Sequence, residues 1–408
     1  MTRPGGGVCH RGSVLAPAGT LATIWLIVFT DLIGFGIVIP LLPLYAEKMN
    51  PSPLQFGLLM AAFSLMQLFF APILGRLSDR VGRRPVLLVS LAGAVAGYLL
   101  FALADSFLLL LLSRIVAGIA GANIATAQAV IADATAPEQR ARGMGLIGAA
   151  FGLGFIAGPA LAGVLVRLSP AAPGLAAAAF SATAMAMTAL RLKETLPPER
   201  RHAAPRSRRG IAALIHAWRD PALGPLLAIS LTVVAGFSAF EVTFAQLVYR
   251  RFGLHAGNIA FLFAYVGVLA AGMQGLLVGR LSRRLGERRL LLAGLAAASL
   301  GLVLVASQHS LPALVAVLPV LTFGQAMVMP ALTTLVSHTA PAQQQGETLG
   351  AYQGAASLAR VIGPVAGQLA LGHLGLGAPA IAASLAAAAA AVAAACLPPR
   401  IASSRVLY

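Results

Sequence analysis

Long apolar segments alternate with short polar segments along almost the whole chain. A membrane-spanning helix needs about 20 mostly apolar residues, and irregular backbone cannot face lipid, so each segment is expected to be one helix. The gaps within each half are as short as Asp105-Ser106, which predicts antiparallel neighbours. The segments fall into two sets of six, at 21–46, 54–75, 85–104, 107–132, 143–167 and 173–191, then at 224–248, 257–279, 290–306, 311–336, 347–372 and 377–398. The pattern predicts an all-α membrane protein with twelve transmembrane helices in two six-helix bundles.

The polar segments divide the chain into five parts. We expect an N-terminal segment at 1–20, an N-terminal bundle at 21–191 and a C-terminal bundle at 223–398. Residues 192–222, between the bundles, are rich in arginine and proline, which is typical of a solvated linker. A short polar tail at 399–408 completes the chain.

Composition excludes a soluble enzyme. Of the 408 residues, 59% are hydrophobic and only 10% are charged, whereas soluble proteins carry about 25% charged residues. Cys9 and Cys396 lie at opposite ends of the chain, so neither a disulfide framework nor a metal site is predicted. The sequence also lacks a nucleotide-binding loop of the Walker type, so ATP is not the expected energy source.

The net charge of +17 follows membrane topology. With both termini placed in the cytoplasm, only Lys48, Arg167, Arg250 and Arg251 of the 29 basic residues fall on the outer side. Two more lie within helices, and the remaining 23 fall on the cytoplasmic side. This asymmetry is the one expected of an inner-membrane protein. Because orientation explains the charge, no nucleic-acid partner is predicted.

The two halves of the chain repeat one another. Residues 75–88 read GRLSDRVGRRPVLL, and residues 279–292 read GRLSRRLGERRLLL, at an offset of 204. Thr135-Ala136-Pro137 and Thr339-Ala340-Pro341 repeat at the same offset. Duplicated six-helix units build secondary transporters, in which the substrate site lies between the halves near the bilayer midplane.

The first copy of this loop resembles the signature loop of the major facilitator superfamily. Its glycines permit a tight turn, Asp79 can face a helix N-terminus, and Arg83 can reach Asp133. A gate is the favoured interpretation, and a basic anchor on the cytoplasmic side is the alternative. In the second copy Arg283 replaces Asp79 and Glu287 replaces Arg83, which predicts a lost or rewired latch. The residues assigned to the gate are Gly75, Asp79, Arg80, Gly82, Arg83, Arg84 and Asp133.

The segment at 143–167 is similar to the glycine-proline motif of proton-coupled antiporters in that superfamily. Small residues allow close helix packing, and a proline removes a backbone hydrogen bond and permits a bend. Generic packing in a glycine-rich protein is the alternative. The motif residues are Gly145, Gly154, Gly158, Pro159 and Gly163.

Residues 31–46, 71–98 and 111–163 are most similar to bacterial tetracycline/proton antiporters. The resemblance implies the major facilitator fold and the twelve-helix drug/proton antiporter branch. Those antiporters carry an acid in helix 3, a histidine in helix 8 and an acid in helix 9. This chain has Gly97, Ala270 and Ala298 at the matching positions, so a metal-tetracycline chelate is not expected to be handled in the same way.

Ionisable side chains inside the bilayer are costly and therefore indicate function. Asp31 is a candidate proton carrier, with a packing hydrogen bond as the alternative. Arg114 corresponds to a family arginine linked to proton transfer and is expected to act on a carboxylate such as Asp31; an arginine reaching the outer interface is the alternative. Glu241 and Arg360 are candidates for an ion pair within the proton-coupling machinery; the alternatives for Glu241 are a second proton site or a contact for a cationic substrate. Candidate cavity-lining residues are Gln128, Gln246, Gln274 and Gln353.

Taken together, these features predict a monomeric transporter that is not an enzyme and needs no cofactor or metal. We expect it to export a small amphiphilic compound, such as a drug, in exchange for protons by alternating access. Transport of a specific metabolite such as a sugar or siderophore is the alternative. A receptor or scaffold is disfavoured because it would not need two gate loops at matching positions.

Overall fold

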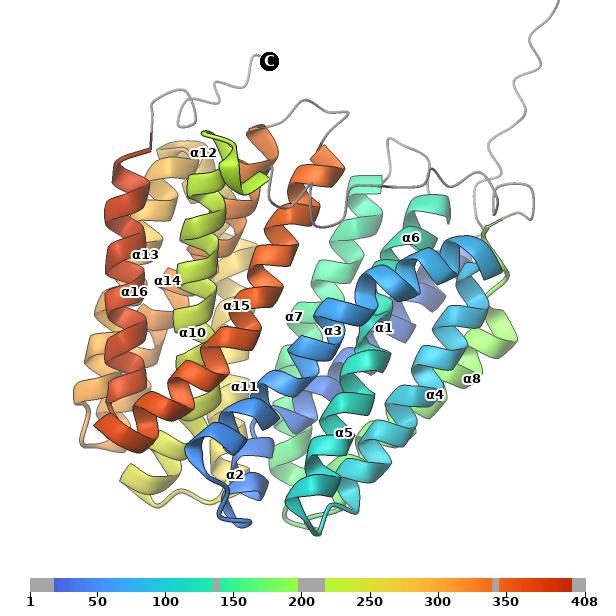
Figure 1. Cartoon of the computed structure of the whole chain (residues 1–408), viewed down its shortest axis with the longest axis horizontal. Helices are drawn as coiled ribbons and strands as arrows, with labels where there is room; N and C mark the ends of the chain where they lie inside the picture. Colours follow the sequence, from blue (N-terminus) through green and yellow to red (C-terminus); the bar gives the residue numbers. More distant parts are fainter. Residues whose placement is uncertain (1–17, 135–139, 197–216, 340–344, 398–408) are drawn as a thin grey trace, which may run out of the picture.

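The computed structural model describes residues 18–134, 140–196, 217–339 and 345–397, and every regular element in these ranges is a helix (Figure 1). The N-terminal half, called the N-half, contains α1 (Ala18–Val38), α2 (Leu42–Glu47), α3 (Pro53–Val81), α4 (Arg83–Ala102), α5 (Phe107–Ala120), η1 (Gly121–Asn123), α6 (Ile124–Ala134), α7 (Arg140–Leu165) and α8 (Ala172–Arg191). The C-terminal half, the C-half, contains α10 (Leu223–Phe252), α11 (Ala256–Met273), η4 (Gln274–Val278), α12 (Gly279–Leu285), α13 (Glu287–Ser307), α14 (Leu311–His338), α15 (Gln345–Leu374) and α16 (Ala378–Ala395). The predicted all-helical fold is confirmed.

Eleven of the described helical segments are long and apolar enough to cross a membrane. The twelfth predicted segment, at 143–167, corresponds to α7, which ends in a shorter apolar stretch, Gly152–Leu165. Some predicted segments are interrupted. The first ends as α1 at Val38, just before Pro40, and resumes as α2, because proline cannot donate a helical hydrogen bond. The protein is therefore an integral membrane protein.

The turns between helices follow from local chemistry. Ser52 and Gln55 form a reciprocal capping box at the start of α3, which satisfies amides that have no partner within the helix. Single glycines separate α3 from α4 and α12 from α13: Gly82 has a φ of 109° and Gly286 a φ of 75°. Residues with a side chain rarely adopt such values. The repeated loops thus share a backbone turn as well as a sequence.

The internal repeat is also visible in how the helices pack. A Cβ atom on Gly97 of α4 would lie 3.0 Å from the backbone nitrogen of Ala117 of α5. At an offset of 204, a Cβ atom on Gly301 of α13 would lie 2.6 Å from the Cα atom of Leu321 of α14. Small residues allow this close approach of backbones. The two halves therefore use the same helix crossing.

The two halves touch mainly at one end of the molecule. We call the end that carries Gly82 and Gly286 the motif end and the end that carries α2 the hairpin end; α12 and α2 mark them in Figure 1. Near the hairpin end, a Cβ atom on Gly57 of α3 would lie 2.7 Å from the Cα atom of Val365 of α15. An ion pair between Glu47 and Arg250 and a contact of the Arg167 guanidinium with the Phe261 ring also join the halves there.

Apolar core clusters show the same asymmetry. At the motif end, one cluster around Leu87 and Ile131 belongs wholly to the N-half. Another, around Leu227 and Leu335, belongs wholly to the C-half. At the hairpin end, Ala260 packs into the N-half cluster and Leu44 into the C-half cluster. The halves are thus fused at the hairpin end and have separate cores at the motif end.

Candidate functional site

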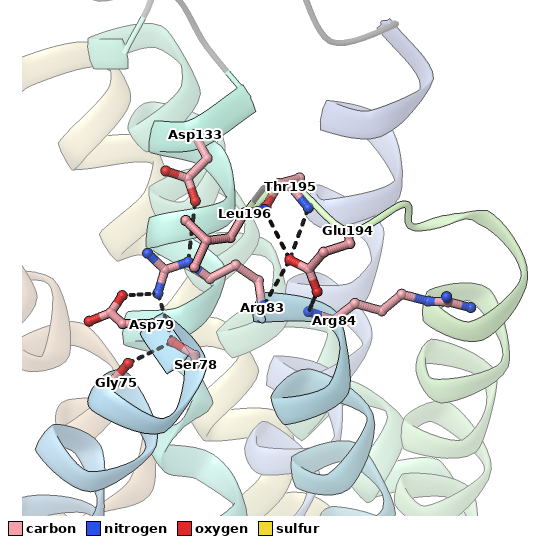
Figure 2. Close-up of polar contacts among 9 residues, drawn as sticks. All are labelled: Gly75, Ser78, Asp79, Arg83, Arg84, Asp133, Glu194, Thr195 and Leu196. Atoms are coloured by element: carbon pink, nitrogen blue, oxygen red, sulfur yellow. Dashed lines mark hydrogen bonds and ion pairs between the residues drawn. The ribbon is translucent and has the colours of Figure 1, made fainter. Parts of the chain in front are cut away.

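Arg83, the first residue of α4, is the centre of a polar network at the motif end. Figure 2 shows its guanidinium between α3 and α6. Nη1 donates to Ser78 Oγ at 2.7 Å and to Asp79 Oδ1 at 2.5 Å, and Nε donates to Asp133 Oδ2 at 3.2 Å. The planar fork of arginine suits this geometry. The side chain therefore ties α3, α4 and α6 together. Asp79 binds the Arg83 guanidinium, whereas the sequence predicted that it would face a helix N-terminus.

Glu194 completes this network, and the sequence analysis did not identify it. Its carboxylate accepts hydrogen bonds from the backbone amides of Arg83 at 2.9 Å and Arg84 at 3.1 Å (Figure 2). It also accepts from the amides of Thr195 and Leu196, each at 3.0 Å. A carboxylate at a helix N-terminus satisfies free amides and favours the helix dipole. Glu194 therefore caps α4, which begins after a glycine and has no capping side chain of its own.

The second copy of the loop is rewired. Ser282 Oγ donates to both carboxylate oxygens of Glu287, at 2.9 and 3.1 Å. Ser78 and Ser282 are equivalent, so the same serine faces a cation in the N-half and an anion in the C-half. The residue equivalent to Asp133 is Ser337, whose hydroxyl donates to its own helix at the carbonyl of Thr334. In the C-half, a hydrogen bond within α14 thus stands in place of the ion pair between Arg83 and Asp133 that joins two helices of the N-half.

A second arginine in each loop binds the end of another helix of the same half. Arg84 Nη2 donates to the carbonyl of Ala189 in α8 at 2.6 Å, and its equivalent Arg288 donates to the carbonyl of Ala395 in α16 at 2.5 Å. Ser78 Oγ donates to the carbonyl of Gly75 at 2.7 Å. Arg80 is exposed. The loop is therefore anchored to α8 through one arginine and to α6 through another.

Glycines of the antiporter motif mediate helix crossings on two sides of α7. Towards α1, a Cβ atom on Gly158 would lie 2.6 Å from the Cα atom of Gly36, and one on Gly154 would lie 2.7 Å from Cβ of Leu32. Towards α11, one on Gly163 would lie 3.0 Å from the carbonyl oxygen of Gly257. Pro159 lies inside α7. The side-chain surroundings of Gly145 lie outside the described residues. This helix therefore contacts both halves through residues without side chains.

The ionisable groups of the N-half gather around a tyrosine. Arg114 is 2% exposed, so it does not reach the outer interface. Its Nε donates to Ser113 Oγ at 3.2 Å and its guanidinium lies 5.2 Å from the Phe101 ring centre, while Nη2 has no partner among the described residues. Tyr98 interacts electrostatically with both Asp31 and Arg114. Tyr98 therefore lies near both charged groups, and the sequence analysis missed it inside an apolar run.

Asp31 also borders a small cavity. The cavity has room for about one water molecule and is lined by Ile27, Val28, Asp31, Leu32, Leu87, Asn123 and Ala127. Apart from the carboxylate of Asp31 and the amide of Asn123, this lining is apolar. Both polar groups therefore belong to the lining of one cavity. The geometry can thus support proton exchange at Asp31.

Glu241 and Arg360 form a second group of ionisable side chains, in the C-half. They interact electrostatically across α10 and α15, but in the described part of the chain they form no direct ion pair. Arg360 also interacts with Tyr352, whose hydroxyl accepts a hydrogen bond from Thr333 Oγ1 at 3.5 Å. Each half therefore holds an acid, an arginine and a tyrosine within its helices.

The four glutamines expected to line a cavity have different surroundings. Gln246 is 1% exposed and accepts a hydrogen bond from Gln368 Nε2 at 2.7 Å, so it joins α10 to α15 and packs inside the C-half. Gln128, Gln274 and Gln353 are exposed. Gln274 opens η4, a turn of π-helix, and such turns are frequent at functional sites.

Positions that carry ionisable groups in tetracycline antiporters are occupied here by packing residues. A Cβ atom on Gly324 of α14 would lie 2.7 Å from the Cα atom of Ala298 of α13, and Ala298 is fully buried. Gly97 is equally close to Ala117, as described above. Longer acidic side chains at Gly97 or Ala298 would need these helices to separate. Close helix packing therefore explains why neither acid is present.

Comparisons with known proteins agree with this architecture. The model of the Major Facilitator Superfamily matches residues 24–364 and 252–406. The tetracycline resistance protein, class G, of Vibrio anguillarum is 36% identical over 349 residues, covering 83% of this chain and 87% of that protein. Major facilitator superfamily domain-containing protein 10 of Bos taurus is 32% identical over 397 residues, covering 85% of both. The crystal structure of the human organic anion transporter MFSD10 (TETRAN) has a TM-score of 0.72 and 26% identity, and covers 93% of this chain and 100% of that chain. The protein is therefore a membrane transporter and not an enzyme, and the chain belongs to the major facilitator superfamily, where it is similar to tetracycline efflux proteins.

Proposed function

We propose that this protein exports a small amphiphilic compound in exchange for protons. The observation that carries the proposal is the carboxyl group of Asp31 within α1, beside a water-sized cavity and one helical turn from Gly34, against which the Tyr98 hydroxyl packs. A carboxyl group within a membrane helix is costly unless it has a function. Asp31 binds and releases the transported proton, and the proton gradient supplies the energy without a cofactor.

Alternating access provides the transport cycle. The motif end faces the cytoplasm of a bacterial cell, with both termini on that side, because this topology places 23 of the 29 basic residues in the cytoplasm, as the positive-inside rule requires. With the halves fused at the hairpin end, the conformation described above is closed to the outside. Export requires the halves to separate there and to close at the motif end. The monomer is the functional unit, since each chain supplies both halves.

Two substrate classes are supported by specific observations. The similarity to tetracycline resistance proteins supports a drug, although Gly97, Ala270 and Ala298 argue against a metal-tetracycline chelate. Buried Arg114, with Nη2 unpartnered in the described residues, and Arg360 support an organic anion, as does the similarity to MFSD10. A specific metabolite such as a sugar or siderophore is the remaining alternative.

Vesicle transport tests this proposal. The purified protein is reconstituted, a pH gradient is imposed, and cationic, neutral and anionic amphiphiles, tetracycline among them, are offered. We expect at least one amphiphile to accumulate against its concentration gradient and to lose that accumulation when a protonophore collapses the pH gradient. Lack of transport across the whole panel, combined with thermal stabilisation by a sugar or siderophore, would contradict drug export and favour the metabolite.

A further inference from the structure

Tyr98 lies near both Asp31 and Arg114, the two ionisable groups inside the apolar helices of the N-half. It is 4% exposed on α4, and a Cβ atom on Gly34 of α1 would lie 3.2 Å from the Tyr98 hydroxyl oxygen. Gly34 is one helical turn beyond Asp31, on the same face. The hydroxyl therefore reaches α1 next to Asp31 only because residue 34 has no side chain.

Arg114 packs against the same helix as Tyr98. Phe101, one turn further along α4, lies under the Arg114 guanidinium at 5.2 Å. Arg114 leaves Nη2 without a partner among the described residues. The charged groups that interact with Tyr98 are Asp31 from α1 and Arg114 from α5. Helix α8 also packs on α4 but contributes no charged group to Tyr98 in the described part of the chain.

Asp31 has a small cavity on one side and Tyr98 on the other. Towards the motif end, Val28, Leu87 and Ala127 line the water-sized cavity. Towards the hairpin end, the Tyr98 hydroxyl lies against Gly34, one turn beyond Asp31. A phenol can donate and accept a hydrogen bond at once, whereas a guanidinium can only donate.

We propose that the Tyr98 hydroxyl is the positioning group that connects Asp31 to Arg114 and controls proton access to Asp31 from the hairpin end. In this conformation Arg114 Nη2 has no hydrogen-bond partner in the described part of the chain, so the guanidinium is free to donate to the hydroxyl oxygen when the link forms, while the hydroxyl donates to the Asp31 carboxylate. Protons then leave Asp31 on the opposite side, through the cavity near Asn123. This inference rests on the proposed role of Asp31 in proton coupling.

A test that needs no transported compound uses infrared spectroscopy of the full-length protein in detergent. The carboxyl band of Asp31 is identified by its absence in Asp31→Asn and is followed as the pH changes. Tyr98→Phe keeps the ring and removes the hydroxyl, so we expect the midpoint of the band's titration to move by about half a pH unit or more. The matched control Tyr265→Phe, on α11 of the C-half, should leave the midpoint unchanged.

Gly34→Ala is a second variant. Its added Cβ atom would lie 3.0 Å from the Tyr98 ring, so it displaces the hydroxyl without removing it, and the midpoint should move again. A midpoint that is unchanged in Tyr98→Phe, or an Asp31 band that never titrates in the unmodified protein, would overturn the inference. If vesicles show no proton-driven export but the midpoint moves, the proposed function fails, while the link between Tyr98 and Asp31 stands. If export is proton-driven and the midpoint stays, only the role of Tyr98 fails.

Discussion

Arg250 Nε donates to Glu47 Oε1 over 2.6 Å and so joins α10 of the C-half to α2 of the N-half at the hairpin end. The other basic residues on this side also make contacts. Lys48 lies over the Tyr45 ring, and Arg167 lies over the Phe261 ring of the opposite half. Arg251 Nη1 donates to the carbonyls of Ala306 and Gln308. Two of the four basic residues expected on the outer side, Arg167 and Arg250, therefore join the two halves at this end.

Breaking the pair between Glu47 and Arg250 should favour opening of the hairpin end. Exposed ion pairs contribute up to about 1 kcal/mol, so Glu47→Gln should raise the open population by up to about fivefold. Spin labels at Asn50 and His309, one in each half, would report the distance by electron resonance.

Two control variants accompany that experiment. Asp105→Asn makes the same change at an exposed acid of the same end and should leave the distance distribution unchanged. Exchanging the two charges, with Glu47→Arg and Arg250→Glu together, should restore it. Equal distributions in Glu47→Gln and the unmodified protein would refute the latch.

Arg83→Lys should destabilise the motif end. A lysine cannot donate simultaneously to Ser78, Asp79 and Asp133 in the way the arginine fork does, and we expect a loss of about 1–3 kcal/mol in the free energy of unfolding. Thermal unfolding in detergent measures this loss. Arg80→Lys, at the exposed neighbour, should have almost no effect, and equal effects of the two substitutions would argue against the network.

Gly158→Ala should loosen the crossing of α1 and α7. Its Cβ atom would lie 2.6 Å from the Cα atom of Gly36, and such overpacking costs about 1–3 kcal/mol. Gly152→Ala in the same helix is the matched control, since a Cβ atom there meets nothing within 4 Å. The two melting temperatures should differ, with Gly158→Ala lower. If Gly158→Ala melts no lower than its control, the glycine is not needed for packing.

Helices, repeat and motif contacts could be predicted because they depend on local patterns. Apolar length predicts the helices, and the gate loop places Arg83 near Asp133. The contacts that were missed join residues far apart in the chain. Glu194 reaches α4 from the start of the arginine-rich segment, and Gln368 pairs with Gln246 across 122 residues. In an apolar helix every face looks alike in the sequence, so only the packed structure shows that Tyr98 lies against Gly34, one turn from Asp31.

The central claim is that Asp31 couples protons to export, and it is tested most directly by comparing two transport modes in Asp31→Asn. Vesicles are assayed for accumulation driven by an imposed pH gradient and for exchange of the same compound at equal pH on both sides. An amide of the same size cannot carry the proton, so we expect gradient-driven accumulation to be lost while equal-pH exchange continues. Full gradient-driven accumulation by Asp31→Asn would contradict the account.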